Sequence, residues 1–173
     1  MNNTEDYLIL DTETTGLSTQ DEIIELGIID LNGQTLYHSM FNPNCLINPQ
    51  AQAIHGIRLT DLQDAPNFSQ EWHTIKTILR GKKILIYNAP FDLRMINQTA
   101  RIHGHDTLLT NRDVNCVMRG YAQKRGIIDP KTKKPRWVKL EQALANEGIP
   151  TKQNHRATDD CLMTLALINK VGL

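Results

Sequence analysis

The first third of the chain lacks basic residues altogether. Residues 1–57 contain eight Asp or Glu and not one Lys or Arg. Two of these acids, Asp11 and Glu13, follow the apolar segment Tyr7–Leu10, which is typical of a β-strand. Side chains alternate between the two faces of a strand, so both carboxylates point the same way, about 7 Å apart. Because two like charges repel and no basic residue is near in sequence, the pair predicts a divalent metal ion.

Long hydrophobic runs are also absent. The longest, such as Ile84–Tyr87, extend over only a few residues, which excludes a membrane-spanning helix. Residues 1–6 show neither the basic region nor the apolar stretch of a secretory signal. The three cysteines, at positions 45, 116 and 161, are odd in number and scattered, which fits neither a disulfide framework nor a zinc site. We therefore expect no membrane contact and a reducing, cytoplasmic setting.

The formal net charge of zero conceals a separation of charge along the chain. Residues 119–139 carry eight Lys or Arg against the single acid Asp129. Such a separation suits a protein that holds a metal at one place and a polyanion at another. The stretch 124–139, with Trp137 inside it, is the best candidate for contacts with nucleic-acid phosphates and bases. The alternative for any individual lysine is a solvated loop without a partner.

Apolar periodicity and turn residues predict an α/β domain. The strands are expected at residues 7–10, 23–31, 35–42, 84–87 and 114–117, with a hairpin at Asn32-Gly33. The helices are expected from Asn67 or Ser69 to 80, at 91–103, from 117 towards 123, at 139–147 and from 155 onward, with short helical turns at 51–56 and 60–62. Three strands followed by strands alternating with helices give a mixed sheet. With 173 residues, the chain is expected to form one domain.

Three further residues are candidates for the chemistry. Asp92 lies at the start of the helix after strand 84–87, and Asp160 lies in the first turn of the last helix. Either acid has an ordinary alternative, because carboxylates at helix N-termini compensate the helix dipole. His155 precedes Asp160 by five residues, and its alternative is an exposed helix cap.

Taken together, these residues predict a hydrolytic site. Four carboxylates with no cation near them in sequence are suited to two hard divalent ions, Mg²⁺ or Mn²⁺. Two such ions about 3.5–4 Å apart are the known arrangement for attack of water on a phosphodiester. A neighbouring histidine is suited to accept the proton of that water.

The chain resembles a known family at three motifs. They are Asp-Thr-Glu-Thr-Thr-Gly at 11–16, Tyr-Asn-Ala-Pro-Phe-Asp at 87–92 and His-Arg-Ala-Thr-Asp-Asp at 155–160. Their order and spacing resemble those of the DnaQ-like 3′–5′ exonucleases, and the histidine resembles that of the DEDDh branch. The resemblance implies an RNase H-like fold, a five-stranded mixed β-sheet flanked by α-helices. It also implies two divalent ions held by Asp11, Glu13, Asp92 and Asp160, and His155 as the general base.

The resemblance also implies where the substrate binds. The backbone and hydroxyl donors of Thr14, Thr15 and Gly16 would hold the 3′ end, and Leu17 resembles an apolar wedge between the last two bases. The remaining candidates for substrate contact are Ile54, His55, Asn88 and Phe91. A short turn with a surface histidine is the alternative at 53–57, and a core position is the alternative for Phe91. Tyr87 departs from the family, in which many relatives have histidine at that position.

The sequence therefore predicts one exonuclease domain over residues 1–173. It would release nucleoside 5′-monophosphates from the 3′ ends of single-stranded DNA or RNA, and a polymerase or other repair or processing proteins are candidate partners. Two other readings stay open. One is a catalytically silent nucleic-acid-binding or proofreading subunit, and the other is a metal-dependent endonuclease or integrase-like member of the same broad fold.

Overall fold

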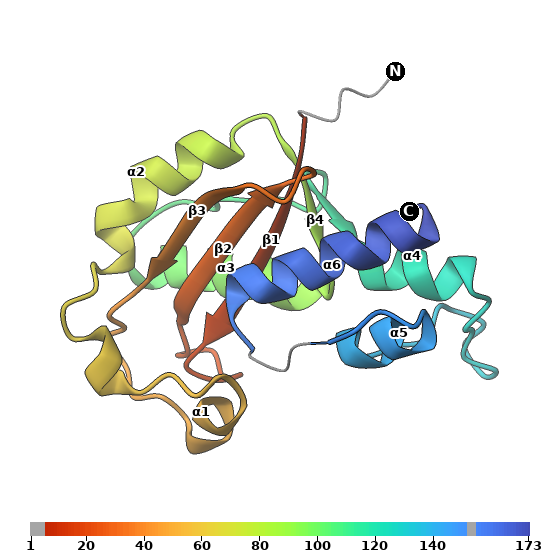
Figure 1. The fold of residues 1–173 in the computed structure, drawn as a ribbon. Coiled ribbons are helices and arrows are strands. Elements are labelled where there is room, and N and C mark those ends of the chain that lie inside the picture. The colour runs from red at the N-terminus through yellow and green to blue at the C-terminus, as the bar shows by residue number, and fades with distance from the viewer. Residues whose placement is uncertain (1–5, 152–154) are drawn as a thin grey trace.

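A five-stranded mixed sheet forms the centre of the protein in the computed structural model, which describes residues 6–151 and 155–173 (Figure 1). The spatial order is β3-β2-β1-β4-β5. β1 pairs with β2, and β2 with β3, in antiparallel fashion, whereas β4 is parallel to both β1 and β5. The strands are β1 Tyr7–Thr14, β2 Ile23–Asp30, β3 Thr35–Met40, β4 Lys83–Ile86 and β5 Val114–Cys116. The predicted α/β class and mixed five-stranded sheet are confirmed.

Helices cover both faces of this sheet (Figure 1). α2 and α3 pack on one face in a core that includes Leu8, Leu10 and Ile28. α4, α5 and α6 pack on the other face, in a second core that includes Ile9 and Ile29. The helices are α1 Pro49–His55, α2 Phe68–Leu79, α3 Ala89–Ile102, α4 Val117–Lys124, α5 Leu140–Asn146 and α6 Ala157–Val171, with a short 3₁₀ helix at Leu59–Leu62.

The second strand is apolar because both of its faces are covered. All but its last residue are buried, with Leu26 and Ile28 in the core beneath α2 and α3 and Ile29 in the core beneath α6. A strand covered on both sides is expected to read as a nearly continuous hydrophobic run. The predicted interior position of the segment 23–31 is therefore confirmed, and the strand ends at Asp30.

The first strand is longer than the predicted segment 7–10. It continues to Thr14 because Asp11 pairs with Gly27 and Glu13 with Glu25 across the antiparallel ladder with β2. The two acids therefore lie within the strand, not beyond its end. The predicted segment ended at Leu10 because only its apolar residues marked it, although the shared face expected for the two acids already required strand geometry at both positions.

Several helix boundaries also differ from the prediction. α1 begins at Pro49 because the side chain of Asn48 accepts a hydrogen bond from the Gln50 amide. α3 begins at Ala89, two residues before the expected start, with Pro90 in its first turn, where a missing N–H has no cost. α6 begins at Ala157, whereas a start at His155 was expected. Asn67 caps α2 in a reciprocal pair with Gln70, which confirms one of the two predicted caps.

Candidate active site

Asp11 and Glu13 project from β1 on the face that α6 covers. They alternate with Thr12 along the strand and share their face with Ile9, which packs in the core beneath α6. Both carboxyl groups are half-buried. The two side chains thus lie on the same face of the sheet, as predicted.

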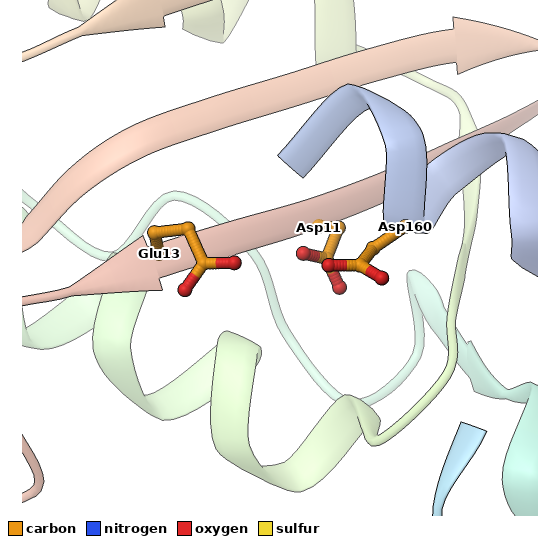
Figure 2. Close-up of side chains that lie close together, drawn as sticks. All are labelled: Asp11, Glu13 and Asp160. Carbon is orange, nitrogen blue, oxygen red and sulfur yellow. The ribbon is translucent and has the colours of Figure 1, made fainter. Parts of the chain in front are cut away.

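Asp160 completes a group of three carboxyl groups. It lies in the first turn of α6, and one carboxylate oxygen from each of Asp11, Glu13 and Asp160 lies within 4.8 Å of the other two. Figure 2 shows the three side chains reaching a common space from β1 and α6. Carboxylate oxygens in such a group are the ligands preferred by hard divalent cations. The three residues can therefore hold a metal ion.

Gly27, which is not among the residues predicted for the site, allows α6 to come this close. It lies opposite Asp11 in the sheet, and a Cβ at this position would lie 2.8 Å from both the Ala157 carbonyl carbon and the Thr158 nitrogen. The backbone of the first turn of α6 thus rests directly on β2. A lone glycine inside a buried strand was the available signal, because it often marks close approach of another backbone.

Gly27→Ala is expected to lower both stability and catalysis. The added methyl group must displace α6, and overpacking of this kind costs about 1–3 kcal/mol of the free energy of unfolding. Moving Asp160 by about 1 Å is expected to reduce kcat roughly 10²-fold. Urea unfolding and steady-state kinetics would measure the two effects.

The matched control is Gly120→Ala, in the middle of α4. A Cβ there would meet only Leu173 Cδ2, at 3.6 Å, and alanine favours a helix over glycine. This variant should keep full activity and unfold at equal or higher urea. Unchanged kinetics in Gly27→Ala would show that the close contact with α6 does not position Asp160.

Asp92 lies beside this group but is not one of its three members. It is buried in the first turn of α3, and its Oδ1 accepts a hydrogen bond of 2.8 Å from Thr12 Oγ1. Its charge acts on both Asp11 and Glu13, so the four predicted acids share one electrostatic environment. The contribution of Thr12, which fixes the Asp92 carboxyl, could not be read from the sequence.

The four carboxyl groups resist ionising together. Burial, followed by the charges of neighbouring acids, raises the pKa of Asp11 well above its usual value and that of Glu13 to about 9. Burial also raises the pKa of Asp92 to about 7, against the opposing hydrogen bond from Thr12, and that of Asp160 to about 6. Groups of like charge with such raised pKa values lack a counter-ion. The donor set therefore fits a divalent metal.

The charge of Arg156 opposes the raised pKa of Glu13, but its guanidinium is bonded to another carboxylate. Arg156, directly before α6, donates from Nε and Nη2 to the carboxylate of Glu25 at 2.8–3.1 Å. Burial alone would raise the pKa of Glu25, but the hydrogen bonds from Arg156 and His38 hold it below its usual value. Arg156 thus neutralises Glu25 and fastens the start of α6 to β2.

His155 lies at the edge of the acidic group. It precedes α6 in a left-handed backbone conformation, with φ of 41°, and its charge acts on Asp160. Its Nε2 lies 3.7 Å from Glu141 Oε1 of α5. His155 also lines a hollow of about 330 Å³ with Asn88. Its side chain is one third exposed, so it can exchange protons with solvent.

A second hollow, of about 420 Å³, adjoins Glu13. The substrate-contact candidates that line it are Thr14, Gly16, Leu17, Ile54, His55 and Phe91. Leu17 and Ile54 are 75% and 60% exposed, which is unusual for large apolar side chains and suits contact with a flat, apolar ligand surface. His55 is buried, and its Nδ1 accepts a hydrogen bond from the Ile57 amide. The alternative of a surface histidine is therefore wrong.

Two predicted substrate contacts lie elsewhere. Thr15 is fully buried, and its hydroxyl donates to Asp21 and accepts from the Glu22 amide. Its amide donates to the Glu22 carbonyl, so neither donor is available to a ligand, and the prediction for Thr15 as a donor was wrong. Asn88 lines the hollow beside His155.

Gly16 is required by the turn, since a Cβ there would lie 2.7 Å from Asp21 Oδ2.

The basic stretch divides into two parts. Lys124 donates to the Gly172 carbonyl, and Arg125 pairs with Glu147 at 2.6 Å, so both support the fold. The ion pairs found among residues 6–151 and 155–173 include none of Lys131, Lys133, Lys134 and Arg136. These four side chains are exposed, and they are the part of the stretch that can meet a polyanion.

Comparison with curated proteins gives close relatives among exonucleases. Uncharacterized exonuclease CP81 of Escherichia phage 186 is 35% identical over 174 residues, covering 97% of this chain and 89% of that protein. The DNA polymerase III subunit epsilon of Escherichia coli K12 is 30% identical over 114 residues, covering 60% of this chain and 47% of the subunit. The match thus spans about half of the polymerase subunit.

Solved structures of exonucleases share the fold. Exonuclease X in complex with 5′ overhanging duplex DNA aligns with a TM-score of 0.69 and 24% identity, over 95% of this chain and 90% of that one. E. coli exonuclease I in complex with a dT13 oligonucleotide aligns with a TM-score of 0.75 and 21% identity, over 95% and 40%. These likenesses confirm the predicted RNase H-like fold. Because the exonuclease (RNase T) family profile also matches residues 8–168, the chain belongs to this family of DnaQ-like exonucleases.

Proposed function

We propose that the protein is a DEDDh exonuclease that degrades single-stranded DNA or RNA from the 3′ end and releases nucleoside 5′-monophosphates. The observation that supports this most strongly is the convergence of Asp11, Glu13 and Asp160. Asp92 and His155 lie beside them, as the DEDDh pattern requires. The proposal treats residues 1–173 as one exonuclease domain.

Each residue has a defined part in this proposal. Asp11, Glu13, Asp92 and Asp160 hold two divalent ions, Mg²⁺ or Mn²⁺, which when bound supply a nucleophilic water at neutral pH and stabilise the leaving oxygen. His155 accepts the proton of the attacking water. The hollow beside Glu13 receives the terminal nucleotide, with Leu17 and Ile54 against its base.

The setting and partners are proposed on the same basis. The relatives include a polymerase subunit, and two structural neighbours were solved with DNA, so we propose a 3′ end exposed by a polymerase or by repair or processing proteins as the substrate. Among the described residues, no helix is both long and apolar enough to cross a membrane. The three cysteines are free thiols, which agrees with a proposed cytoplasmic location.

A digestion time course tests the function. The protein is incubated with 5′-labelled single- and double-stranded DNA and RNA in Mg²⁺ or Mn²⁺, and the products are resolved by length. We expect a ladder that shortens from the 3′ end, with monophosphates as the released product and no activity in EDTA.

Other outcomes of the time course would identify the competing functions. Binding that survives EDTA with no cleavage in any metal would identify a silent binding subunit. Cleavage of a circular single strand would identify an endonuclease, since a circle offers no end. Activity on RNA but not on DNA would assign a role to the 2′-hydroxyl.

A further inference from the structure

Glu25 is a fifth carboxyl group next to the acidic group, and the proposed chemistry does not use it. It lies opposite Glu13 in the antiparallel ladder of β1 and β2, and directly opposite residues share one face of a sheet. Its side chain is fully buried. Burial and the charge of Asp160 raise the pKa of Glu13 most, and the charge of Glu25 comes next. A buried charge in this place is unfavourable unless it is paired and hydrogen-bonded, so the partners of Glu25 indicate its function.

Donors of the chain occupy both oxygens of Glu25. Arg156 donates from Nε to both of them, at 3.1 and 3.0 Å, and from Nη2 to Oε1 at 2.8 Å. His38 on β3 donates from Nε2 to Oε1 at 2.7 Å, and the Ala157 amide donates to Oε2 at 3.3 Å. A carboxylate offers about four acceptor positions, and these donors use them. Glu25 is therefore an anchor for other residues, and it is not available as a further metal ligand.

This anchor fixes the start of the helix that carries Asp160. Arg156 is the N-cap residue of α6, and Ala157 is its first residue. The Arg156 carbonyl accepts a hydrogen bond of 3.0 Å from the Asp160 amide. Glu25 binds the side chain of Arg156 and the backbone of Ala157, so the chain directly after His155 is attached to β2 at two points.

His155 has a backbone conformation that needs this support. Its φ of 41° lies in the left-handed region, which residues other than glycine rarely adopt and keep only where the surrounding structure imposes it. This conformation sets the direction of the side chain, whose Nε2 lies 3.7 Å from Glu141 Oε1 of α5. If the chain after His155 were free, the residue would relax to an ordinary conformation and its imidazole would point elsewhere.

We propose that Glu25 and Arg156 are positioning residues that together hold His155 in its left-handed conformation and so direct its imidazole towards the acidic group. The inference rests on the proposed exonuclease function, in which His155 accepts the proton of the attacking water. Glutamine could not replace the carboxylate, because it would present an N–H donor where Arg156 and His38 also donate. Since a buried ion pair is in general a weak source of stability, orientation of the base is the better reason for a charge at this place.

Arg156→Lys tests the proposal through kinetics. Lysine keeps the positive charge but cannot form the forked contact of a guanidinium, so we expect kcat to fall about 10- to 10²-fold, the scale of a misplaced group, with KM unchanged. In the His155→Ala background the same change should cause no further loss, because no imidazole remains to be directed. An equal fractional loss in both backgrounds, or no loss in either, would overturn the proposal.

The matched control is Arg58→Lys, which makes the same change in another forked pair. Arg58 donates from Nε and Nη2 to the Asp61 carboxylate at 3.2 and 2.8 Å, at the short 3₁₀ helix. This variant should keep the kcat of its parent in both backgrounds.

A second variant keeps the proposal testable if Arg156→Lys does not fold. Replacing both members of a buried ion pair by apolar residues is often neutral or stabilising, so Glu25→Met combined with Arg156→Met should fold. It should show the same loss of kcat, and a wild-type kcat in this double variant would contradict the positioning role.

NMR of the histidine rings tests the positioning without relying on activity. The His155 ring signal is the one missing in His155→Asn, and in Arg156→Lys it should move towards the chemical shift of the exposed His73. In Arg58→Lys it should not move. If the signal moves but the wild-type protein never cleaves, the positioning stands and the proposed function fails. Cleavage by the wild-type protein, with the His155 signal and kcat unchanged in Arg156→Lys, would overturn the positioning and leave the proposed function in place.

Discussion

Asp11→Asn is expected to abolish nucleic-acid cleavage while making the metal-free protein more stable. The loss of activity should be at least about 10³-fold, the scale of removing one electrostatic stabiliser of a transition state. The gain in stability follows from the repulsion at the site, because burial and the charges of Asp92 and Asp160 hold the pKa of Asp11 well above its usual value. Relief of about 1–2 kcal/mol would raise Tm by about 2–8 °C.

The raised pKa values of these carboxyl groups also predict how the stability of the metal-free protein changes with pH. A carboxyl group whose pKa is higher in the folded than in the unfolded state binds more protons when folded, so stability is lost as pH rises. For Glu13 the pKa rises from its ordinary value of 4.5 to about 9 on folding, and for Asp160 from 3.8 to about 6. We therefore expect metal-free wild-type Tm to fall from about pH 5 to pH 9, and saturating Mg²⁺ or Mn²⁺ to oppose that fall.

A control separates the acidic group from acids in general. Asp64 is exposed, and Asp64→Asn should leave activity and Tm as in the wild-type protein. Differential scanning fluorimetry with and without Mn²⁺, beside a digestion assay, measures both properties. A lower Tm for metal-free Asp11→Asn would mean that the Asp11 carboxyl stabilises the fold. It would contradict the expectation that the acidic group destabilises the metal-free protein.

Local patterns in the sequence were sufficient for most of the fold. Apolar runs bounded by turns located all five strands, the cap at Asn67 located the start of α2, and the proline at position 90 placed the start of α3 to within two residues. The acids were found because three motifs carried them in order. Such features are determined by residues near one another in the chain, so local sequence patterns are enough to predict them.

What could not be predicted depends on contacts between distant segments. The extension of β1 through Asp11 and Glu13 is produced by pairing with β2. The bonds from Arg156 to Glu25 and from Tyr87 to Val138 join residues 131 and 51 positions apart. The motif predicts a ligand contact for Thr15 together with its neighbours, yet its side chain turns inward to Asp21. Within one motif, a polar residue can therefore stabilise the local fold while its neighbours are candidates for ligand contact.

His155→Ala is expected to reduce kcat by about 10²–10⁴-fold, the usual contribution of a general base, with little change in KM. The acidic group itself is untouched by this substitution, since it is built from Asp11, Glu13 and Asp160. The rise in Tm on adding Mn²⁺ should therefore be kept. Because the side chain is partly exposed and borders a hollow, added imidazole has room to enter and should restore part of the rate.

Rescue by imidazole distinguishes a proton acceptor from a structural residue. The backbone at His155 is in a left-handed conformation, so a loss of activity alone could reflect a displaced α6. His155→Asn keeps a side chain that tolerates this conformation but cannot accept the proton, and it should be as inactive as alanine. His73→Ala, at an exposed histidine on α2, should behave as wild type. Wild-type kcat in His155→Asn would exclude His155 as the base.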